Sequence, residues 1–335
     1  MNFRTFSDLN AIIFNNLDRI PEDVDLIVGI PRSGMLVANI ISLYMNLPMV
    51  DFNSFIEGRI YSCGSTRKKN WISNVEEARR ILLVDDSTNT GKAIKEAEFL
   101  LKDSKFHDKI VTLIPYVTSK SKSYPDIYFE ECEMPRVFEW NYLHHLHLEK
   151  MCFDLDGVLC RDPYDIENDD GERYKYFIQN VPAKIVPSFE IGYIITARLE
   201  KYRRETEEWL KKNNIRYGQL IMMDCASKEE RIRSGAHGWF KGTNYKKLRN
   251  AILFIESNEQ QAVEIANISK KAVFCTENHM FYEAKGMYRA LNRVKTEQKS
   301  VIRKIYDFIV PYIPKSIDKM MKKMIRVVRK KGDKE

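Results

Sequence analysis

Paired cysteines, long apolar runs and an amino-terminal leader are all missing from this sequence of 335 residues. Its six cysteines occur singly, without the spacing of disulfide or metal-binding motifs, so we expect reduced thiols in a cytoplasmic protein. No stretch reaches the roughly 20 apolar residues of a membrane span. Residues 1–17 lack the apolar core of a signal peptide. The sequence therefore predicts a protein that is neither secreted nor membrane-spanning.

Basic charge is concentrated at the carboxyl-terminal end. From Lys299 to Glu335 there are 12 Lys and Arg residues against 4 Asp and Glu, a net charge of +8. The whole chain carries +7, so residues 1–298 carry −1. After Pro314, apolar residues recur at helical spacing with basic residues between them. A basic amphipathic helix of this kind binds an anionic membrane surface, which predicts peripheral attachment at the inner face of the cytoplasmic membrane.

The same tail has other possible partners. Its apolar face would also suit packing on a partner or on a second copy of the chain, in a homo-oligomer. Nucleic acid is not expected, because the basic residues lack interleaved aromatic side chains and no base-reading motif is present.

The length suits two domains followed by this tail. Strands that alternate with helices predict an α/β fold with two doubly wound, Rossmann-like parallel sheets. The predicted units are residues 1–148, 149–286 and 287–335. The predicted strands are 25–30, 50–52, 81–84, 110–115, 151–153, 192–196, 219–223 and 252–255. The predicted helices are 7–17, with Ser7 or Asp8 as cap, and 35–46, 93–101, 200–213, 244–251 and 259–269.

Two adjacent carboxylates follow a predicted strand of the first domain. Residues 81–84 are continuously apolar, as expected for a parallel strand covered on both faces. Asp85 and Asp86 come next, before a hydroxyl-rich turn that reaches Gly91 and opens a helix. The N–H groups at such a helix start can hold a phosphate, and carboxylates can accept hydrogen bonds from neighbouring ring hydroxyls. The pattern predicts a site for a phosphorylated sugar.

Two further segments of the first domain offer positive charge. The turn that follows the strand 25–30 presents successive N–H groups beside the cation Arg32, an arrangement that suits a pyrophosphate. The loop 59–69 is polar and basic. Such a loop is either a solvated surface or, as in the type I phosphoribosyltransferases that these segments resemble, a mobile loop that closes over the substrate.

These motifs resemble the pyrophosphate loop and the phosphoribosyl-pyrophosphate (PRPP) motif of the type I phosphoribosyltransferases. One departure is Ala93, where that family often has Thr or Ser. The resemblance implies transfer of 5-phosphoribose from PRPP to a β-linked product, with Mg²⁺ neutralising the pyrophosphate. Asp85 and Asp86 would be the catalytic pair that binds the ribose diol. The substrate-binding residues implied are Pro31, Arg32, Ser33, Gly34, Arg67, Lys68, Lys69, Ser87, Thr88, Asn89, Thr90 and Gly91.

A second strand followed by carboxylates opens the second domain. The apolar run 151–153 leads into Asp154, Leu155, Asp156 and Gly157. The intervening residue lets both carboxylates turn toward one cation. This stretch resembles motif I of the haloacid dehalogenase-like (HAD) phosphatases, and the resemblance extends over most of the second domain.

The HAD resemblance assigns a role to each motif residue. Asp154 would be the nucleophile and Asp156 the general acid and base. Thr196 would match motif II, and Lys241 would offset charge between phosphate and nucleophile, with Lys228 as the other candidate. Mg²⁺ would be held by Asp154, Asp156 and Glu256, and Arg198 would bind substrate. The sequence departs at Glu256-Ser257-Asn258, where many relatives have two acids.

The segment that joins the two domains is aromatic and rich in histidine. Trp140 could stack on an acceptor or serve as a core aromatic at the domain junction. His144, His145 and His147 have no carboxylate or cysteine at ligand spacing, which disfavours a metal site.

Together the two resemblances predict a two-step enzyme. A transferase would install 5-phosphoribose on an acceptor, and a phosphatase would remove the phosphate to leave β-ribofuranose. This combination resembles the ribofuranose-adding enzymes of bacterial polysaccharide assembly, which implies a lipid-linked glycan as acceptor. Only about 40 residues separate motifs I and II, too few for a large cap domain over the phosphatase site. The alternatives are nucleobase salvage coupled to a 5′-nucleotidase and a non-enzymatic PRPP sensor.

Overall fold

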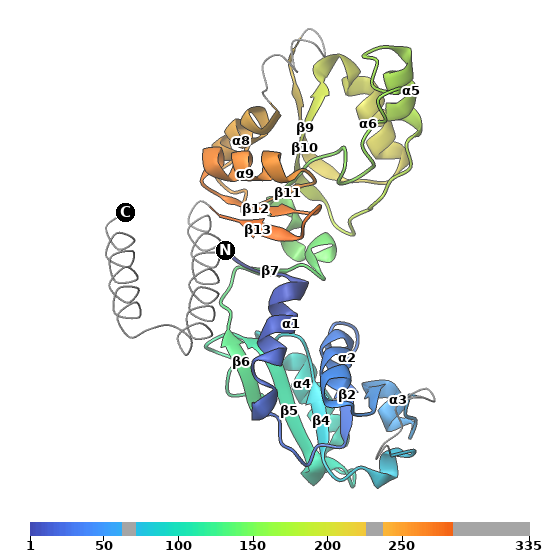
Figure 1. Ribbon diagram of the computed structural model, residues 1–335, viewed down its shortest axis with the longest axis vertical. Coiled ribbons are helices and arrows are strands. Elements are labelled where there is room, and N and C mark those ends of the chain that lie inside the picture. Colours follow the sequence, from blue (N-terminus) through green and yellow to red (C-terminus); the bar gives the residue numbers. More distant parts are fainter. Residues whose placement is uncertain (62–71, 226–236, 284–335) are drawn as a thin grey trace, which may run out of the picture. The chain divides into compact units, whose positions relative to one another are not determined.

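Two sheets organise the protein in the computed structural model, which describes residues 1–61, 72–225 and 237–283 (Figure 1). The first sheet has the strand order β3-β2-β4-β5-β6, and every neighbouring pair in it is parallel. The second has the order β10-β9-β8-β11-β12-β13, and its pairs from β10 to β12 are parallel. This confirms the predicted parallel α/β architecture.

The first half alternates strands and helices around the first sheet. Two short strands, β1 and β7, pair with each other in parallel outside that sheet. The elements are β1 (Asn2–Arg4), α1 (Phe6–Phe14), β2 (Leu26–Gly29), α2 (Gly34–Met45), β3 (Met49–Asp51), α3 (Phe52–Ile56), β4 (Ile81–Val84), α4 (Lys92–Leu101), β5 (Ile110–Val117), β6 (Ile127–Glu131) and β7 (Arg136–Phe138).

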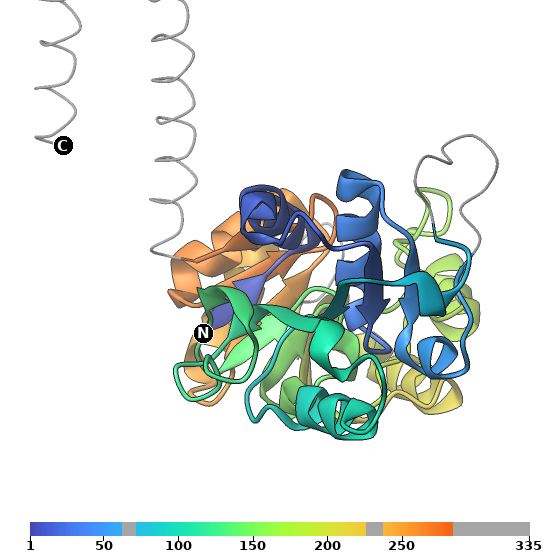
Figure 2. The ribbon, with the colours of Figure 1, turned by 90° about the horizontal axis from the view of Figure 1, so that it is seen from below.

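Apolar side chains cover both faces of the first sheet. Leu82 and Val84 of β4 belong to a core with α1 and α2, whereas Ile81 and Leu83 belong to a core with α3 and α4. Figure 2 shows the blue helices α1 and α2 on one side of these strands and the teal helix α4 on the other. A strand buried on both faces needs an uninterrupted apolar run, which β4 has.

The first helix begins earlier than predicted. Its cap is Thr5 rather than Ser7 or Asp8. The N–H of Asp8 donates to Thr5 Oγ1 at 3.1 Å, and Asp8 Oδ2 accepts from the N–H of Thr5 at 2.9 Å. These two hydrogen bonds satisfy N–H groups that have no partner within the helix. Asp8 therefore completes a capping box, but the N-cap residue is Thr5.

The second half builds the second sheet and its helices. Strand β8 lies between β9 and β11, so the ends of these three strands are neighbours. The predicted helix 200–213 divides into a 3₁₀ turn (Glu200–Tyr202) and α6. The elements are β8 (Met151–Phe153), α5 (Glu172–Asn180), β9 (Ile191–Leu199), α6 (Arg203–Lys212), β10 (Tyr217–Met223), α8 (His237–Lys247), β11 (Leu253–Glu256), α9 (Glu259–Ser269), β12 (Ala272–Cys275) and β13 (Met280–Tyr282).

The predicted bounds 244–251 for a helix were wrong, because the observed helix α8 covers His237–Lys247. Its early turns contain Gly238 and Gly242, which face α9. A Cβ on Gly242 would lie 3.2 Å from Ile265 Cα, and one on Gly238 would lie 2.1 Å from Glu264 Oε2. The two glycines allow α8 to pack closely on α9, but they also weaken the helical pattern in the sequence.

Residues 1–281 form one compact unit. The predicted boundary between residues 148 and 149 falls inside it, just before β8, and stays a prediction. Within the described ranges, no helix is both long and apolar enough to cross a membrane. The predicted tail 287–335 lies outside the described residues.

Candidate active sites

The ends of β2 and β4 bring the first two motifs together. Gly29 pairs with Val84 in the parallel register, so the turn 31–34 meets Asp85 and Asp86 at one edge of the sheet. The peptide bond between Pro31 and Arg32 is cis. A Cβ on Gly34 would lie 2.7 Å from the Val84 carbonyl oxygen. Glycine is therefore required where α2 begins against the end of β4.

The Asp86 carboxylate is held by two side chains far from it in sequence. Ser33 Oγ donates to Asp86 Oδ1 at 2.8 Å, and Trp140 Nε1 donates to Asp86 Oδ2 at 2.7 Å. Asp86 is only 5% exposed. Each oxygen still has a lone pair for a ligand, because a carboxylate offers about four acceptor positions. The two donors thus fix the orientation of one predicted diol-binding acid.

Asp85 differs from its neighbour in protonation. Its Oδ1 accepts the N–H of Asp86 at 2.8 Å. Burial and the nearby Asp86 charge raise the pKa of the Asp85 carboxyl to about 8, so in the ligand-free protein it holds a proton at neutral pH. A protonated acid beside a carboxylate can both donate to and accept from neighbouring hydroxyls of a sugar ring.

The turn from Ser87 to Gly91 carries the predicted phosphate-binding groups. Thr88 is fixed from two sides, because its N–H donates to the Tyr116 carbonyl at 2.9 Å and its carbonyl accepts from Ser121 Oγ at 3.0 Å. Thr88 Oγ1 also accepts the N–H of Gly91 at 2.8 Å. The structure therefore brings together the predicted residues of this turn, Ser87, Thr88, Asn89, Thr90 and Gly91, at the start of α4, with Asn89 and Thr90 exposed.

A cavity of about 580 Å³ adjoins this first site. Arg32 and Ser33 line one part of it, and Trp140 contributes its indole, which stacks on Phe138 with ring centroids 4.7 Å apart. The other lining residues are Leu36, Met134, Asn141, His144, His145, Leu146 and His147. Trp140 thus packs in an aromatic cluster and also lines a cavity, and its predicted stacking on an acceptor stays a prediction. The predicted loop residues Arg67, Lys68 and Lys69 lie outside the described residues.

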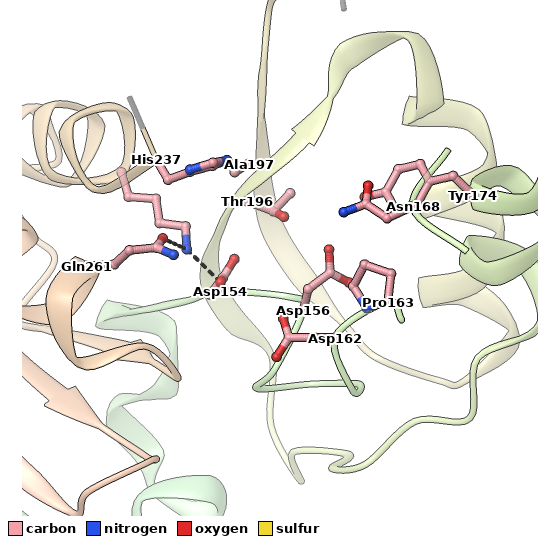
Figure 3. Close-up of a pocket in the computed structure, with 11 residues that line it drawn as sticks. Asp154, Asp156, Asp162, Pro163, Asn168, Tyr174, Thr196, Ala197, His237 and Gln261 are labelled. Carbon is pink, nitrogen blue, oxygen red and sulfur yellow. Dashed lines mark hydrogen bonds and ion pairs between the residues drawn. The ribbon is translucent and has the colours of Figure 1, made fainter. Parts of the chain in front are cut away.

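The second site lies where β8, β9 and β11 end. The N–H of Asp154 donates to the Ile255 carbonyl at 3.0 Å, which fixes the carboxylate just beyond β8. Figure 3 shows Asp154, Asp156 and Thr196 around a common space. Lys241 contacts Asp154 there. The structure therefore groups the predicted HAD motif residues. Lys228, the other candidate lysine, lies outside the described residues.

Lys241 is the buried cation of this site. Its Nζ lies 2.6 Å from Asp154 Oδ2, 2.8 Å from Glu256 Oε2 and 2.8 Å from Gln261 Oε1, and the residue is 2% exposed. Burial opposes its charge, but the two carboxylates raise the pKa of Lys241 above its usual range. Burial also raises the pKa of the Asp154 carboxyl, against the attraction of Lys241, to about 7. One ammonium thus neutralises much of the charge of two buried acids.

Arg198 holds the second carboxylate of motif I. Its Nη2 lies 2.6 Å from Asp156 Oδ1, and its Nε lies 3.1 Å from Asp156 Oδ2. The Arg198 side chain is fully buried, so in this geometry it positions Asp156 instead of facing the cavity. The Cys160 thiol also donates to Asp156 Oδ1 at 3.3 Å. Burial and the charge of Asp156 raise the pKa of Cys160, which keeps this thiol protonated.

The predicted Mg²⁺ ligands of the second site fit a cation only in part. Asp154 Oδ1 is buried with no hydrogen-bond partner, as a metal-binding oxygen would be before the ion arrives. Glu256 is different, because Oε2 contacts Lys241 and Oε1 accepts the N–H groups of Ser257 and Asn258 at 2.9 and 3.2 Å. The described residues include no cluster of three or more acids, histidines and cysteines in metal-binding geometry.

A cavity of about 290 Å³ opens above Asp154 and Asp156. Thr196 and Lys241 also line it, and the Thr196 hydroxyl accepts the N–H of Arg198 at 3.2 Å. Sequence reasoning did not identify several lining residues, which lack a motif of their own. Gln261 carried the clearest signal, since it lies in the first turn of α9, directly after β11. The unforeseen residues are Asp162, Pro163, Asn168, Tyr174, Ala197, His237 and Gln261 (Figure 3).

Comparisons with known proteins bear on the fold alone. No protein-family model matches the chain, and no curated protein matches it. Among solved structures, a purine phosphoribosyltransferase from Pyrococcus horikoshii is similar, with 21% identity over 42% of this chain and 92% of that chain and a TM-score of 0.31. The xanthine-guanine-hypoxanthine phosphoribosyltransferase of Helicobacter pylori shares 15% identity over 42% of this chain and 93% of its own, with a TM-score of 0.31. A structure of the Pnkp1/Rnl/Hen1 complex covers 76% of this chain and 97% of its own at 13% identity, with a TM-score of 0.24.

Proposed function

We propose that the first site transfers 5-phosphoribose from PRPP to a hydroxyl of a glycan acceptor. The observation that carries this proposal is the convergence at one sheet edge of the 31–34 turn, the Asp85 and Asp86 pair and the start of α4. The first suits a pyrophosphate, the second a vicinal diol and the third a 5-phosphate. PRPP presents these three groups in one molecule.

The transfer exchanges one bond at the anomeric carbon. The acceptor oxygen forms a bond to that carbon as the bond to pyrophosphate breaks, and the configuration inverts from α to β. The acceptor hydroxyl loses its proton to solvent or to the departing pyrophosphate. Asp85 and Asp86 hold the ribose ring while Arg32 faces the leaving group. Mg²⁺, when bound with PRPP, would neutralise the pyrophosphate charge.

We propose that the second site hydrolyses the phosphomonoester that the first reaction leaves. Asp154 attacks the phosphorus, and the ribose 5-oxygen departs with a proton from Asp156. Asp156 then takes a proton from the water that cleaves the aspartyl phosphate. Arg198 orients Asp156, and Lys241 offsets the negative charge that phosphate brings to Asp154. Mg²⁺ at Asp154 Oδ1 would supply further charge neutralisation.

The sum of the two reactions is a β-ribofuranosyl group on a glycan. A role in bacterial surface polysaccharide assembly supplies such an acceptor on a lipid carrier, at the cytoplasmic membrane. The tail charge of +8 from Lys299 to Glu335 supports peripheral attachment there. This final assignment rests on the resemblance of the combined motifs.

A comparison of the wild type with one variant tests the function directly. Wild type and Asp154→Asn are incubated with PRPP, Mg²⁺ and membrane lipid-linked glycan, and products are identified by mass spectrometry. We expect ribose on the glycan from wild type and phosphoribose from Asp154→Asn, because the variant lacks only the nucleophile of the second step. An unmodified glycan in both reactions, with added nucleobases converted to nucleosides, would replace the proposal with nucleobase salvage. PRPP binding without turnover of either acceptor would indicate a sensor.

A further inference from the structure

We propose that the cavity beside Asp86 binds the acceptor as a glycan sugar ring, and that Trp140 links this acceptor site to the ribose site. The inference rests on the proposed phosphoribosyl transfer and adds the location and chemistry of its second substrate. It concerns the cavity of about 580 Å³, a size within the range of roughly 300–1,000 Å³ for small-molecule sites.

The position of the cavity is the first support. Arg32 and Ser33 line it and also belong to the predicted pyrophosphate turn. Trp140 lines it as well, while its Nε1 donates to Asp86 at 2.7 Å. A molecule in the cavity is thus separated from the ribose-binding acids by a single side chain. That proximity is what an acceptor needs if its hydroxyl is to approach the anomeric carbon.

The lining supplies what a sugar ring binds. An indole offers an apolar surface for the C–H face of a pyranose, and the imidazoles of His144, His145 and His147 offer hydrogen bonds to its hydroxyls. No carboxylate is present among the described residues that line the cavity. Trp140 packs against the rings of Phe138, Tyr116 and Phe6, which hold the indole in place beside the cavity.

His145 is suited to donate to such a hydroxyl. Its Nδ1 accepts the N–H of His147 at 3.1 Å, which leaves Nε2 as the protonated nitrogen of the neutral ring. Burial, His147 and Arg136 lower the pKa of His145 to about 4, so the ring is neutral at physiological pH. The cavity therefore presents the neutral ring of His145 together with the cation Arg32.

Four variants separate the acceptor site from the ribose site. His147→Ala removes a ring from the cavity, and His147→Gln restores a hydrogen-bonding side chain. Trp140→Phe keeps an aromatic face but removes the N–H that contacts Asp86. His107→Ala is the control, because His107 is exposed and does not line the cavity. Each full-length protein is assayed for PRPP binding by calorimetry and for transfer to a lipid-linked glycan, with acceptor KM and kcat determined separately.

The expected results form a pattern. His147→Ala raises the acceptor KM about fivefold, as loss of one hydrogen bond would, with unchanged PRPP affinity, and His147→Gln recovers part of the loss. Trp140→Phe weakens PRPP affinity more than it changes the acceptor KM. His107→Ala matches wild type in both assays.

Two results would overturn the inference in distinguishable ways. A wild type that transfers to glycan, with an acceptor KM unaltered by His147→Ala, would place the acceptor elsewhere and leave the proposed function intact. A wild type that binds no PRPP, or that uses nucleobases and not glycans, would remove the proposed function itself and the sugar site with it.

Discussion

Lys241 shows how one side chain can serve both the folded state and the chemistry. Its ammonium group is the shared partner of Asp154 and Glu256, which are themselves 5% and 0% exposed. Removing one member of a buried charge cluster leaves the others uncompensated, and that penalty is much larger than the net value of the cluster.

We predict that Lys241→Met lowers the free energy of unfolding by about 3–5 kcal/mol at neutral pH. Urea denaturation followed by circular dichroism measures the change. Lys246→Met is the matched control, because Lys246 lies on the same helix but is exposed, and it should shift stability by less than about 0.5 kcal/mol. Equal midpoints for the two variants would contradict the assigned role of Lys241.

Asp85 gives a pH-dependent prediction. Its pKa is raised to about 8 by burial and by Asp86, so the folded state holds a proton that the unfolded state has released. The protonated Asp85 therefore makes a contribution to the free energy of unfolding. This contribution is fully present at pH below the pKa of Asp85 in the unfolded chain, and it is lost as pH rises through about 8. Asp85→Asn cannot ionise.

The melting temperature of Asp85→Asn should therefore rise relative to wild type as pH increases from 5 to 9, by about 2–4 °C for each kcal/mol gained. Thermal scans of the ligand-free proteins at each pH test this. A constant difference across the range would show that Asp85 does not titrate there. PRPP is left out of the scans, because its hydroxyls would change the environment of the pair.

The sequence could predict the positions of site residues that directly follow a strand. Asp85, Asp86 and Asp154 follow short apolar runs, and a parallel sheet places such positions at one edge whatever else surrounds it. The Trp140 bond to Asp86 spans 54 positions and the Arg198 bond to Asp156 spans 42. Contacts of that kind depend on how distant segments pack, and no local pattern encodes them.

At the scale of elements, the start of α4 depends on Gly91. This residue caps the helix with φ 72°, and a Cβ there would lie 2.3 Å from the Tyr124 ring. Gly58 has a similar φ of 78° but nothing within 4 Å of its missing Cβ. The two positions therefore separate backbone strain from steric overlap.

We predict that Gly58→Ala costs about 1–2 kcal/mol, the strain of a left-handed residue with a side chain. Gly91→Ala should cost more than that, and it should also weaken PRPP binding, because the displaced turn carries the phosphate-binding groups. Chemical denaturation and calorimetry provide the two measurements. If both variants lost the same stability, the contact with Tyr124 would be unimportant.

Three elements have the bounds that the sequence predicted. Strands 81–84 and 151–153 are apolar runs, and helix 259–269 has apolar residues at helical spacing. The sequence analysis misplaced helix α8 because it contains Gly238 and Gly242. Glycine has a low helix propensity, although at these positions it allows close packing on α9. The sequence analysis predicted none of the strands β1, β6, β7, β12 and β13.

At the scale of the whole molecule, net charge distinguishes residues 1–298 from the tail. Residues 1–298 carry −1, so attraction to an anionic membrane must come from the segment that follows. The proposed attachment is therefore electrostatic in large part, and such attraction weakens with added salt.

We predict that the full-length protein binds phosphatidylserine vesicles at low salt and detaches at high salt. Lys322→Glu with Lys323→Glu should weaken binding by at least about 2 kcal/mol, from roughly 1 kcal/mol for each lost cation. Lys211→Glu with Lys212→Glu is the matched control on the exposed end of α6. Vesicle sedimentation measures the affinity. Equal losses for the two double variants would locate the membrane contact outside the tail.

The pairing of β1 with β7 has a consequence for the order of events on the ribosome. Phe3 lies opposite Val137, so residues near the beginning of the chain cannot find their partner until 134 more residues have been made. At about 5–20 residues per second, that wait is roughly 7–27 s. The five-stranded sheet can form as its own strands emerge, whereas β1 must remain unpaired through that interval. Translation rate, and chaperones that cover nascent apolar segments, should therefore affect the yield of this protein through its first few residues.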